Sequence, residues 1–213
     1  MPSAAWLAAA VALWMAVWWA TEAIPVAATA LLPLAVFDPL GITSIREAAA
    51  PYANPIIFLY LGGFTMAVAL ERWGLHRRIA LAVIDKTGSN GKRLIAGFML
   101  VCAVLSMWMT NTSTTIMLLP IVFSVTAVIR DNVPNVTEQE RDNFQIAMLL
   151  GLAYAASIGG LATLIGTPPN ALLMGYMSET YGVEISFAKW MLVGIPVSLT
   201  MLPITWLVLT RYL

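Results

Sequence analysis

Charged residues are scarce in this chain of 213 residues: they make up 10% of it, whereas soluble domains carry about 25%. Apolar residues make up 60%, and the mean hydropathy is +0.84. The formal net charge is zero, so no nucleic-acid partner is implied. This composition indicates an integral membrane protein made of helices, and we expect an all-α fold in contact with the lipid bilayer.

Cysteine and histidine are almost absent, with one residue of each: Cys102, in an apolar run, and His76, in a basic stretch. A single cysteine excludes a disulfide framework, and the two residues together provide no cluster of metal ligands. The sequence also lacks a combination of base, nucleophile and metal ligands that could perform catalysis. An enzyme is therefore not expected.

Apolar runs predict about five membrane helices, one of them broken. The predicted segments are Ala4–Ala20, Ala23–Phe37, Ile56–Leu70, a broken helix over residues 144–178 and a last span over residues 187–210. Pro25 and Pro33 interrupt the second segment, which predicts a kinked or partial span. Thr43 or Ser44 followed by Glu47 predicts the start of a short interfacial helix.

Six of the eleven Lys and Arg residues lie between residues 72 and 93: Arg72, Arg77, Arg78, Lys86, Lys92 and Arg93. Apolar Ile79, Val83 and Ile84 lie among them, which predicts a helix lying in the membrane interface. By the positive-inside rule, residues 72–93 and the polar loop of residues 130–143 are expected on the cytoplasmic side.

Two apolar runs, Leu94–Met109 and Ile116–Ile129, flank the polar segment Thr110–Thr115. Each run is shorter than the roughly 20 residues that a span needs, which predicts a re-entrant helical hairpin over residues 92–130 with its tip inside the membrane. Two full spans would return the chain to the same side, so the shortness of the runs decides between the two interpretations. Hydroxyls in membrane helices also bond back to carbonyls or join helices, but six consecutive polar residues favour a binding site.

A second polar interruption, Gly166–Asn170, follows the apolar run that ends at Ile165. Thr167 is a suitable N-cap for a helix that restarts there, and Pro168 suits the first helical position. A simple kink is the alternative. At the first interruption, Thr112 or Ser113 is the expected N-cap of the second hairpin helix.

Each interruption would present free carbonyls at one helix end and free N–H groups at the other. In transporters such N-termini face anionic substrates, while unwound carbonyls coordinate Na+. No Asp, Glu, Lys, Arg or His lies between residues 94 and 129 or between residues 144 and 177. A proton relay usually needs such a group, so neutral oxygens and N–H groups here favour joint binding of Na+ and an anion.

Three motifs resemble those of the divalent anion:sodium symporter family, the dicarboxylate and citrate transporters. The family's Ser-Asn-Thr hairpin signature resembles Ser106–Thr112 followed by Thr115–Pro120. The family's second signature resembles the stretch from Ser157–Gly160 through Gly166–Asn170. Its early pair of spans resembles Trp18–Pro25 together with Leu31–Pro33. The motifs occur in the family's order, and the resemblance covers nearly the whole chain.

The resemblance implies a homodimeric elevator transporter in the plasma (inner) membrane, built from two inverted repeats. Residues 1–91 would belong to the scaffold, with the interfacial helix around Arg77–Ile84 as the arm, and residues 92–213 to the moving transport part. The site residues that it implies are Ser106, Thr110, Asn111 and the backbone around Gly166 for Na+, and Asn111, Thr112, Thr167 and Pro168 for a substrate carboxylate.

Two features depart from the family's pattern. Thr110 stands where serine is common, which keeps the hydroxyl but adds a methyl group. Only one hairpin signature occurs, so the chain corresponds to the N-terminal repeat and its facing second repeat is missing. We expect Na+-coupled transport of dicarboxylates such as succinate or malate. The alternatives are a Na+-independent exchanger, a carrier of citrate or sulfate, and a structural half without transport activity of its own.

Overall fold

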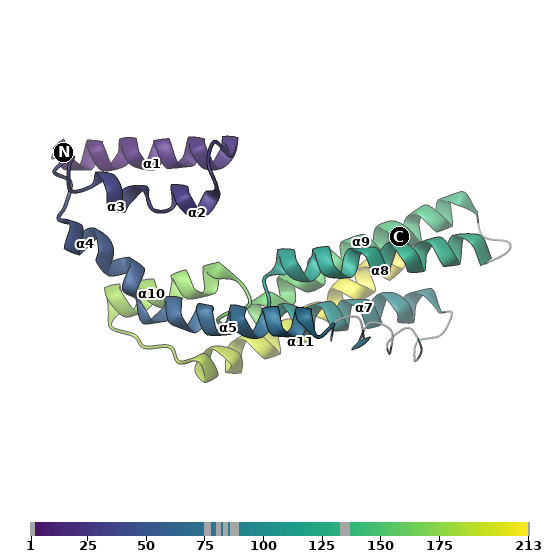
Figure 1. The fold of residues 1–213 in the computed structure, drawn as a ribbon. Helices are drawn as coiled ribbons and strands as arrows, with labels where there is room; N and C mark the ends of the chain where they lie inside the picture. Colours follow the sequence, from purple (N-terminus) through teal and green to yellow (C-terminus); the bar gives the residue numbers. More distant parts are fainter. Residues whose placement is uncertain are drawn as a thin grey trace. The chain divides into compact units, whose positions relative to one another are not determined.

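The computed structural model describes residues 3–74, 78–79, 82, 85, 90–132 and 137–212, and within these ranges it contains helices and no strand (Figure 1). The predicted all-α fold is therefore confirmed. The chain forms two compact units, residues 1–58 and 59–213. The predicted boundary at residue 91 separates a scaffold part from a transport part, which is a division by function, and it stays a prediction.

The first unit packs a long helix against two short ones. Its elements are α1 (Ser3–Thr21), α2 (Val26–Thr29), α3 (Leu32–Val36), α4 (Ile45–Ala49) and the 3-10 turn η1 (Ala50–Ala53). Pro25 immediately precedes α2, and Pro33 lies in the first turn of α3, so two short helices replace one continuous span. The Tyr52 hydroxyl donates a hydrogen bond to the Ala30 carbonyl at 2.6 Å, which holds the chain after α4 against this pair.

The start of α4 confirms the predicted cap. Ser44 and Glu47 form a capping box, in which the Glu47 N–H donates to Ser44 Oγ and the Ser44 N–H donates to Glu47 Oε2. Hydrogen bonds from the Thr43 and Ser44 side chains lower the pKa of the Glu47 carboxyl from its ordinary value. A charged Glu47 therefore stays in place at the helix start at neutral pH.

The second unit is built around one central helix. Its elements are α5 (Pro55–Arg72), which begins in the first unit, α7 (Gly91–Ser106), α8 (Asn111–Asn132), α9 (Glu138–Leu161), α10 (Pro168–Tyr181) and α11 (Phe187–Tyr212). Helix α9 packs against α7, α8 and α11 (Figure 1). The apolar core joins Phe98 and Cys102 of α7, Leu118 of α8, and Met148 and Leu152 of α9.

Glycine permits the closest approach between α7 and α9. A β-carbon on Gly159 would lie 2.2 Å from the Ala103 carbonyl oxygen, a distance that no side chain could adopt. Two further contacts hold α11 to this pair. The Ser198 hydroxyl donates to the Ile158 carbonyl at 2.7 Å, and the Trp206 indole N–H donates to the Lys92 carbonyl at 2.9 Å.

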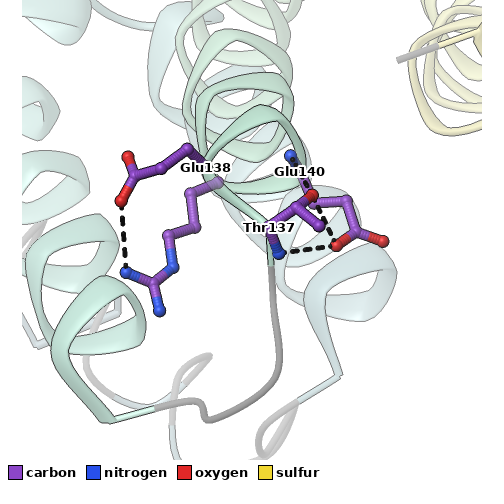
Figure 2. Close-up of polar contacts among 4 residues, drawn as sticks. Thr137, Glu138 and Glu140 are labelled. Carbon is purple, nitrogen blue, oxygen red and sulfur yellow. Dashed lines mark hydrogen bonds and ion pairs between the residues drawn. The ribbon is translucent and has the colours of Figure 1, made fainter.

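Helix α9 begins earlier than the predicted span, which was expected to start near Phe144. A second capping box accounts for the difference: Figure 2 shows Thr137 and Glu140 joined by hydrogen bonds at the helix start. The Thr137 N–H lies 2.9 Å from Glu140 Oε2, and the Glu140 N–H lies 3.3 Å from Thr137 Oγ1. The polar residues before Phe144 thus form the first turns of the helix.

Among the described residues, five helices are long and apolar enough to cross a membrane: α1, α5, α8, α9 and α11. Helix α8 is longer than predicted because the polar segment is itself helical from Asn111 onward; for example, the Thr115 hydroxyl donates to the Asn111 carbonyl at 2.7 Å. By length α8 could cross a membrane, whereas α7 has 16 residues and falls short. The re-entrant hairpin therefore stays a prediction. Most of the predicted arm helix around Arg77–Ile84 lies outside the described residues.

Candidate functional site

Two interruptions between helices meet in the second unit. The first, residues 107–110, separates α7 from α8 where the chain reverses (Figure 1). The second, residues 162–167, separates α9 from α10 and lies slightly earlier than the predicted Gly166–Asn170. The Thr163 hydroxyl donates to the Met107 carbonyl, so the two interruptions are in direct contact.

Ser106 and Asn111 place three oxygens close together. Ser106 Oγ lies 2.8 Å from Asn111 Oδ1 and 2.7 Å from the Ala156 carbonyl oxygen, and its side chain is fully buried. A serine hydroxyl carries one proton and can donate to one of these oxygens at a time. The second oxygen contact therefore needs another source of positive charge: the Asn111 NH2 supplies it when that group faces Ser106, and a bound cation supplies it when Oδ1 faces Ser106.

Gly160 and Gly166 complete this cluster. A β-carbon on Gly160 would lie 2.4 Å from Asn111 Oδ1 and 3.3 Å from the Gly166 carbonyl oxygen, so both oxygens lie close to the Gly160 backbone. A β-carbon on Gly166 would lie 2.5 Å from the Gly160 carbonyl oxygen and 2.8 Å from that of Ser106. The structure thus brings together the predicted residues Ser106, Asn111 and Gly166.

The donor set suits a hard monovalent cation such as Na+. Within the described ranges, no three His, Cys, Asp or Glu residues gather, and the oxygens near Gly160 come from carbonyl, amide and hydroxyl groups. Thr114, one turn after Asn111, has a buried hydroxyl that makes no hydrogen bond in the described part of the chain. Residues three apart share a helix face, so this hydroxyl lies on the Asn111 side of α8. A buried polar group without a partner commonly indicates a water or an ion.

Thr110 caps the start of α8. Its Oγ1 accepts the Ser113 N–H at 3.2 Å and lies 3.0 Å from the Ser113 hydroxyl, so Thr110 caps α8. The expectation of Thr112 or Ser113 as the cap is wrong, because the helix begins at Asn111 and includes both. The described hydrogen bonds of the Thr110 side chain are thus made within the first turn of α8, and its expected role as a Na+ ligand stays a prediction.

The expected carboxylate contacts lie at two helix starts. Thr112 is exposed in the first turn of α8, and the backbone N–H groups of Asn111 and Thr112 have no partner in the described structure. Thr167 precedes α10 as expected, but its side chain makes no capping bond. Pro168 and Pro169 have no N–H, and the Asn170 N–H donates to the Thr167 carbonyl. Free backbone donors for an anion are thus found at α8 and not at α10.

Two side chains bind the carbonyls that the second interruption exposes. The Asn170 amide donates to the Gly160 carbonyl at 2.9 Å and to the Thr163 carbonyl at 2.7 Å. The Tyr60 hydroxyl lies 2.9 Å from the carbonyls of both Leu164 and Thr167. Sequence reasoning assigned neither residue to the site. Asn170 belongs to the recognised motif, whereas Tyr60 of α5 carries no sequence signal that links it to residues 164–167.

Replacing Asn170 with alanine is expected to destabilise the second interruption. Each buried carbonyl left without a donor costs about 1–3 kcal/mol, so the melting temperature should fall by several degrees. Thermal unfolding of the purified chain in detergent measures this. Asn143→Ala is the matched control, because among the described residues the Asn143 side chain accepts a hydrogen bond only from the exposed side chain of Gln139. Equal melting temperatures for the two variants would contradict the assigned role of Asn170.

Comparison with known proteins identifies relatives of this chain. Residues 16–213 match the family model described as citrate transporter. The chain belongs to the citrate transporter family. It is also similar to the sodium-dependent dicarboxylate transporter SdcS of Staphylococcus aureus, strains USA300 and COL, with 46% identity over 205 residues in each case. The alignment covers 95% of this chain and 39% of each relative, so the chain spans well under half of their length.

The family assignment confirms the resemblance read from the three sequence motifs. It makes this chain a member of a transporter family and not of an enzyme family. The matched region contains both interruptions, so the cluster at Gly160 lies within the part of the chain that the family shares.

Proposed function

We propose that this chain provides a Na+ site and one half of a dicarboxylate site in a Na+-coupled transporter of the plasma membrane. The observation that carries the proposal is the convergence of Asn111 Oδ1 and the Gly166 carbonyl oxygen above Gly160, with Ser106 Oγ in contact with Asn111. The printed name of the similar S. aureus proteins, sodium-dependent dicarboxylate transporter, supports the choice of ion and substrate.

The bound cation would be held by neutral oxygens alone. It therefore brings a net positive charge into a region that has no carboxylate of its own, from residue 94 to residue 129 and from residue 144 to residue 177. A substrate carboxylate offsets this charge, and in a low-dielectric environment that attraction is strong. Each ligand thus favours binding of the other, which is the physical basis for coupled transport.

The carboxylate would bind at the start of α8. The N–H groups of Asn111 and Thr112 and the positive end of the helix dipole face this position, and the Thr112 hydroxyl adds a donor. Thr167 supplies a hydroxyl from the second interruption. Pro168 can contribute only apolar contact, because it has no N–H.

The movement would follow the elevator scheme of the family resemblance. In this scheme residues 92–213, including a re-entrant hairpin, slide relative to a scaffold formed by residues 1–91 and the partner of a homodimer. The loops at residues 72–93 and 130–143 would face the cytoplasm. A second repeat would supply the other half of the substrate site.

A second candidate function is that of a structural half, which binds Na+ but does not transport on its own. The observation that favours it is the coverage: the chain spans 39% of the length of the similar transporters. Such a half would need a complementary repeat to enclose the substrate.

Na+ is expected to stabilise the purified chain in lipid nanodiscs. A ligand at one hundred times its Kd stabilises the folded state by about 2.7 kcal/mol, which raises the melting temperature by several degrees. The measurement is a thermal melt in NaCl against KCl and choline chloride at equal ionic strength. A melting temperature that is the same in all three salts would contradict the proposed Na+ site.

Uptake of labelled succinate into liposomes that contain only this chain separates the two candidates. Saturable uptake driven by a Na+ gradient supports the carrier. Na+-dependent stabilisation without uptake supports the structural half. Uptake that does not depend on a Na+ gradient but requires dicarboxylate inside the liposomes would identify an exchanger instead.

A further inference from the structure

Thr163 lies in the second interruption and is fully buried. Its hydroxyl donates to the Met107 carbonyl of the first interruption and accepts the Gly166 N–H at 3.1 Å. Its own carbonyl accepts the Asn170 amide at 2.7 Å. One residue is therefore hydrogen-bonded to both interruptions and to the first turn of α10.

Most other threonine hydroxyls in the described helices bond within their own helix. Thr65, Thr115 and Thr210 each donate to the carbonyl four residues earlier, and Thr200 lies close to the Pro196 and Val197 carbonyls. The Thr163 hydroxyl reaches a carbonyl 56 residues away in sequence. Local bonding within a helix therefore does not account for its position.

One partner of the hydroxyl, Gly166, belongs to the candidate cation site, and the other, Met107, adjoins that site in sequence. Met107 directly follows Ser106, whose Oγ contacts Asn111 Oδ1. Gly166 packs against Ser106 and Gly160, and its carbonyl oxygen lies close to the Gly160 backbone, as Asn111 Oδ1 does. A hydroxyl has one proton and two lone pairs, so it can donate to Met107 and accept from Gly166 at once. Valine has nearly the same shape and can do neither.

We propose that Thr163 is a positioning residue: its hydroxyl fixes Gly166 relative to the Ser106–Asn111 pair and thereby sets the spacing of the oxygens that select Na+. This inference rests on the proposed Na+ site. Oxygens held at fixed separation favour the cation that fits them, and oxygens that can move accommodate other sizes. Thr163 therefore determines which monovalent cation binds, without contacting it.

The test uses Thr163→Val, Thr163→Cys and Thr163→Ser, with Thr200→Val as the matched control on an exposed part of α11. The half-saturating concentrations of Na+ and Li+ are measured from thermal stabilisation of the full chain in nanodiscs. Thr163→Val is expected to raise the half-saturating Na+ concentration by about tenfold or more and to reduce the preference for Na+ over Li+. Thr163→Ser keeps the hydroxyl and should remain within about threefold of the wild type, with Thr163→Cys between them.

A purely structural role predicts a different pattern. Thr163→Val would then melt at a lower temperature in KCl, while its half-saturating Na+ concentration and its Na+ preference would equal those of Thr200→Val; this result overturns the inference. If Thr163→Val does not fold, Thr163→Cys decides, because a wild-type Na+ preference in that variant equally overturns it. Absence of any Na+ response in the wild-type chain would instead reject the proposed function, and the inference with it.

Discussion

Replacing Gly160 with alanine is expected to abolish the stabilisation of the chain by Na+. The added methyl group would lie 2.4 Å from Asn111 Oδ1 and 3.3 Å from the Gly166 carbonyl oxygen, and the first distance is too short for Oδ1 to keep its position. The Asn111 amide is the end of a flexible side chain, so it would move away and lose its contact with Ser106. We expect the half-saturating Na+ concentration to rise by about 100-fold or more, because one proposed ligand, Asn111 Oδ1, is displaced.

The folding of the Gly160→Ala variant should be affected far less than its Na+ binding. Alanine is the better helix former by about 1 kcal/mol, which offsets part of the strain. Gly62→Ala serves as the matched control, because a β-carbon there has no atom within 4 Å. Gly159→Ala provides the contrast: its methyl group would lie 2.2 Å from the Ala103 carbonyl oxygen and should lower the melting temperature in every salt. Wild-type Na+ affinity in Gly160→Ala would show that the cation does not bind above Gly160.

Replacing Asn111 with alanine is expected to remove Na+ binding and carboxylate binding together. Asn111 Oδ1 is the oxygen shared between Ser106 and the space above Gly160, and alanine has no oxygen to replace it. Without the cation, a carboxylate at the start of α8 loses its compensating charge. Na+-dependent melting and Na+-dependent succinate binding, measured on the same preparation, should both disappear.

Asn143→Ala again serves as the control for the Asn111→Ala variant, since it removes the same amide from a residue outside the cluster. Because Asn111 is the first residue of α8 and Thr110 provides the cap, the helix start should survive the substitution. Near-normal Na+ dependence in Asn111→Ala would exclude Asn111 from the site.

The sequence predicted those features that depend on local chemistry. Composition indicated membrane helices, Ser44 and Glu47 predicted a capping box, and Thr167-Pro168 predicted a helix start; all three are present. The start of α8 was misplaced because consecutive hydroxyl residues were interpreted as a loop. In the structure their side chains cap the helix or bond to its carbonyls, so the helix begins at Asn111.

Two of the residues that sequence reasoning missed, Gly160 and Thr163, depend on which segments face each other in the fold. Gly160 contributes to the site because α9 brings it against Asn111 of α8, and Thr163 because the second interruption lies beside Met107. These contacts join residues about 50 positions apart, and no local pattern reports them. The family motifs led to Ser106, Asn111 and Gly166, but the close packing of Gly160 against Asn111 and Gly166 is a property of the folded chain alone.

The burial of the single cysteine has a practical consequence. Cys102 is fully buried in the core, where its thiol contacts the Leu152 carbonyl at 3.3 Å. A thiol reagent therefore has no exposed native target, and the unaltered chain already serves as the background for cysteine-scanning. New cysteines placed one at a time from residue 107 to residue 132 would report, by their labelling from each side of the bilayer, the depth of every turn of α8. That profile distinguishes a helix that crosses the membrane from one that enters and returns.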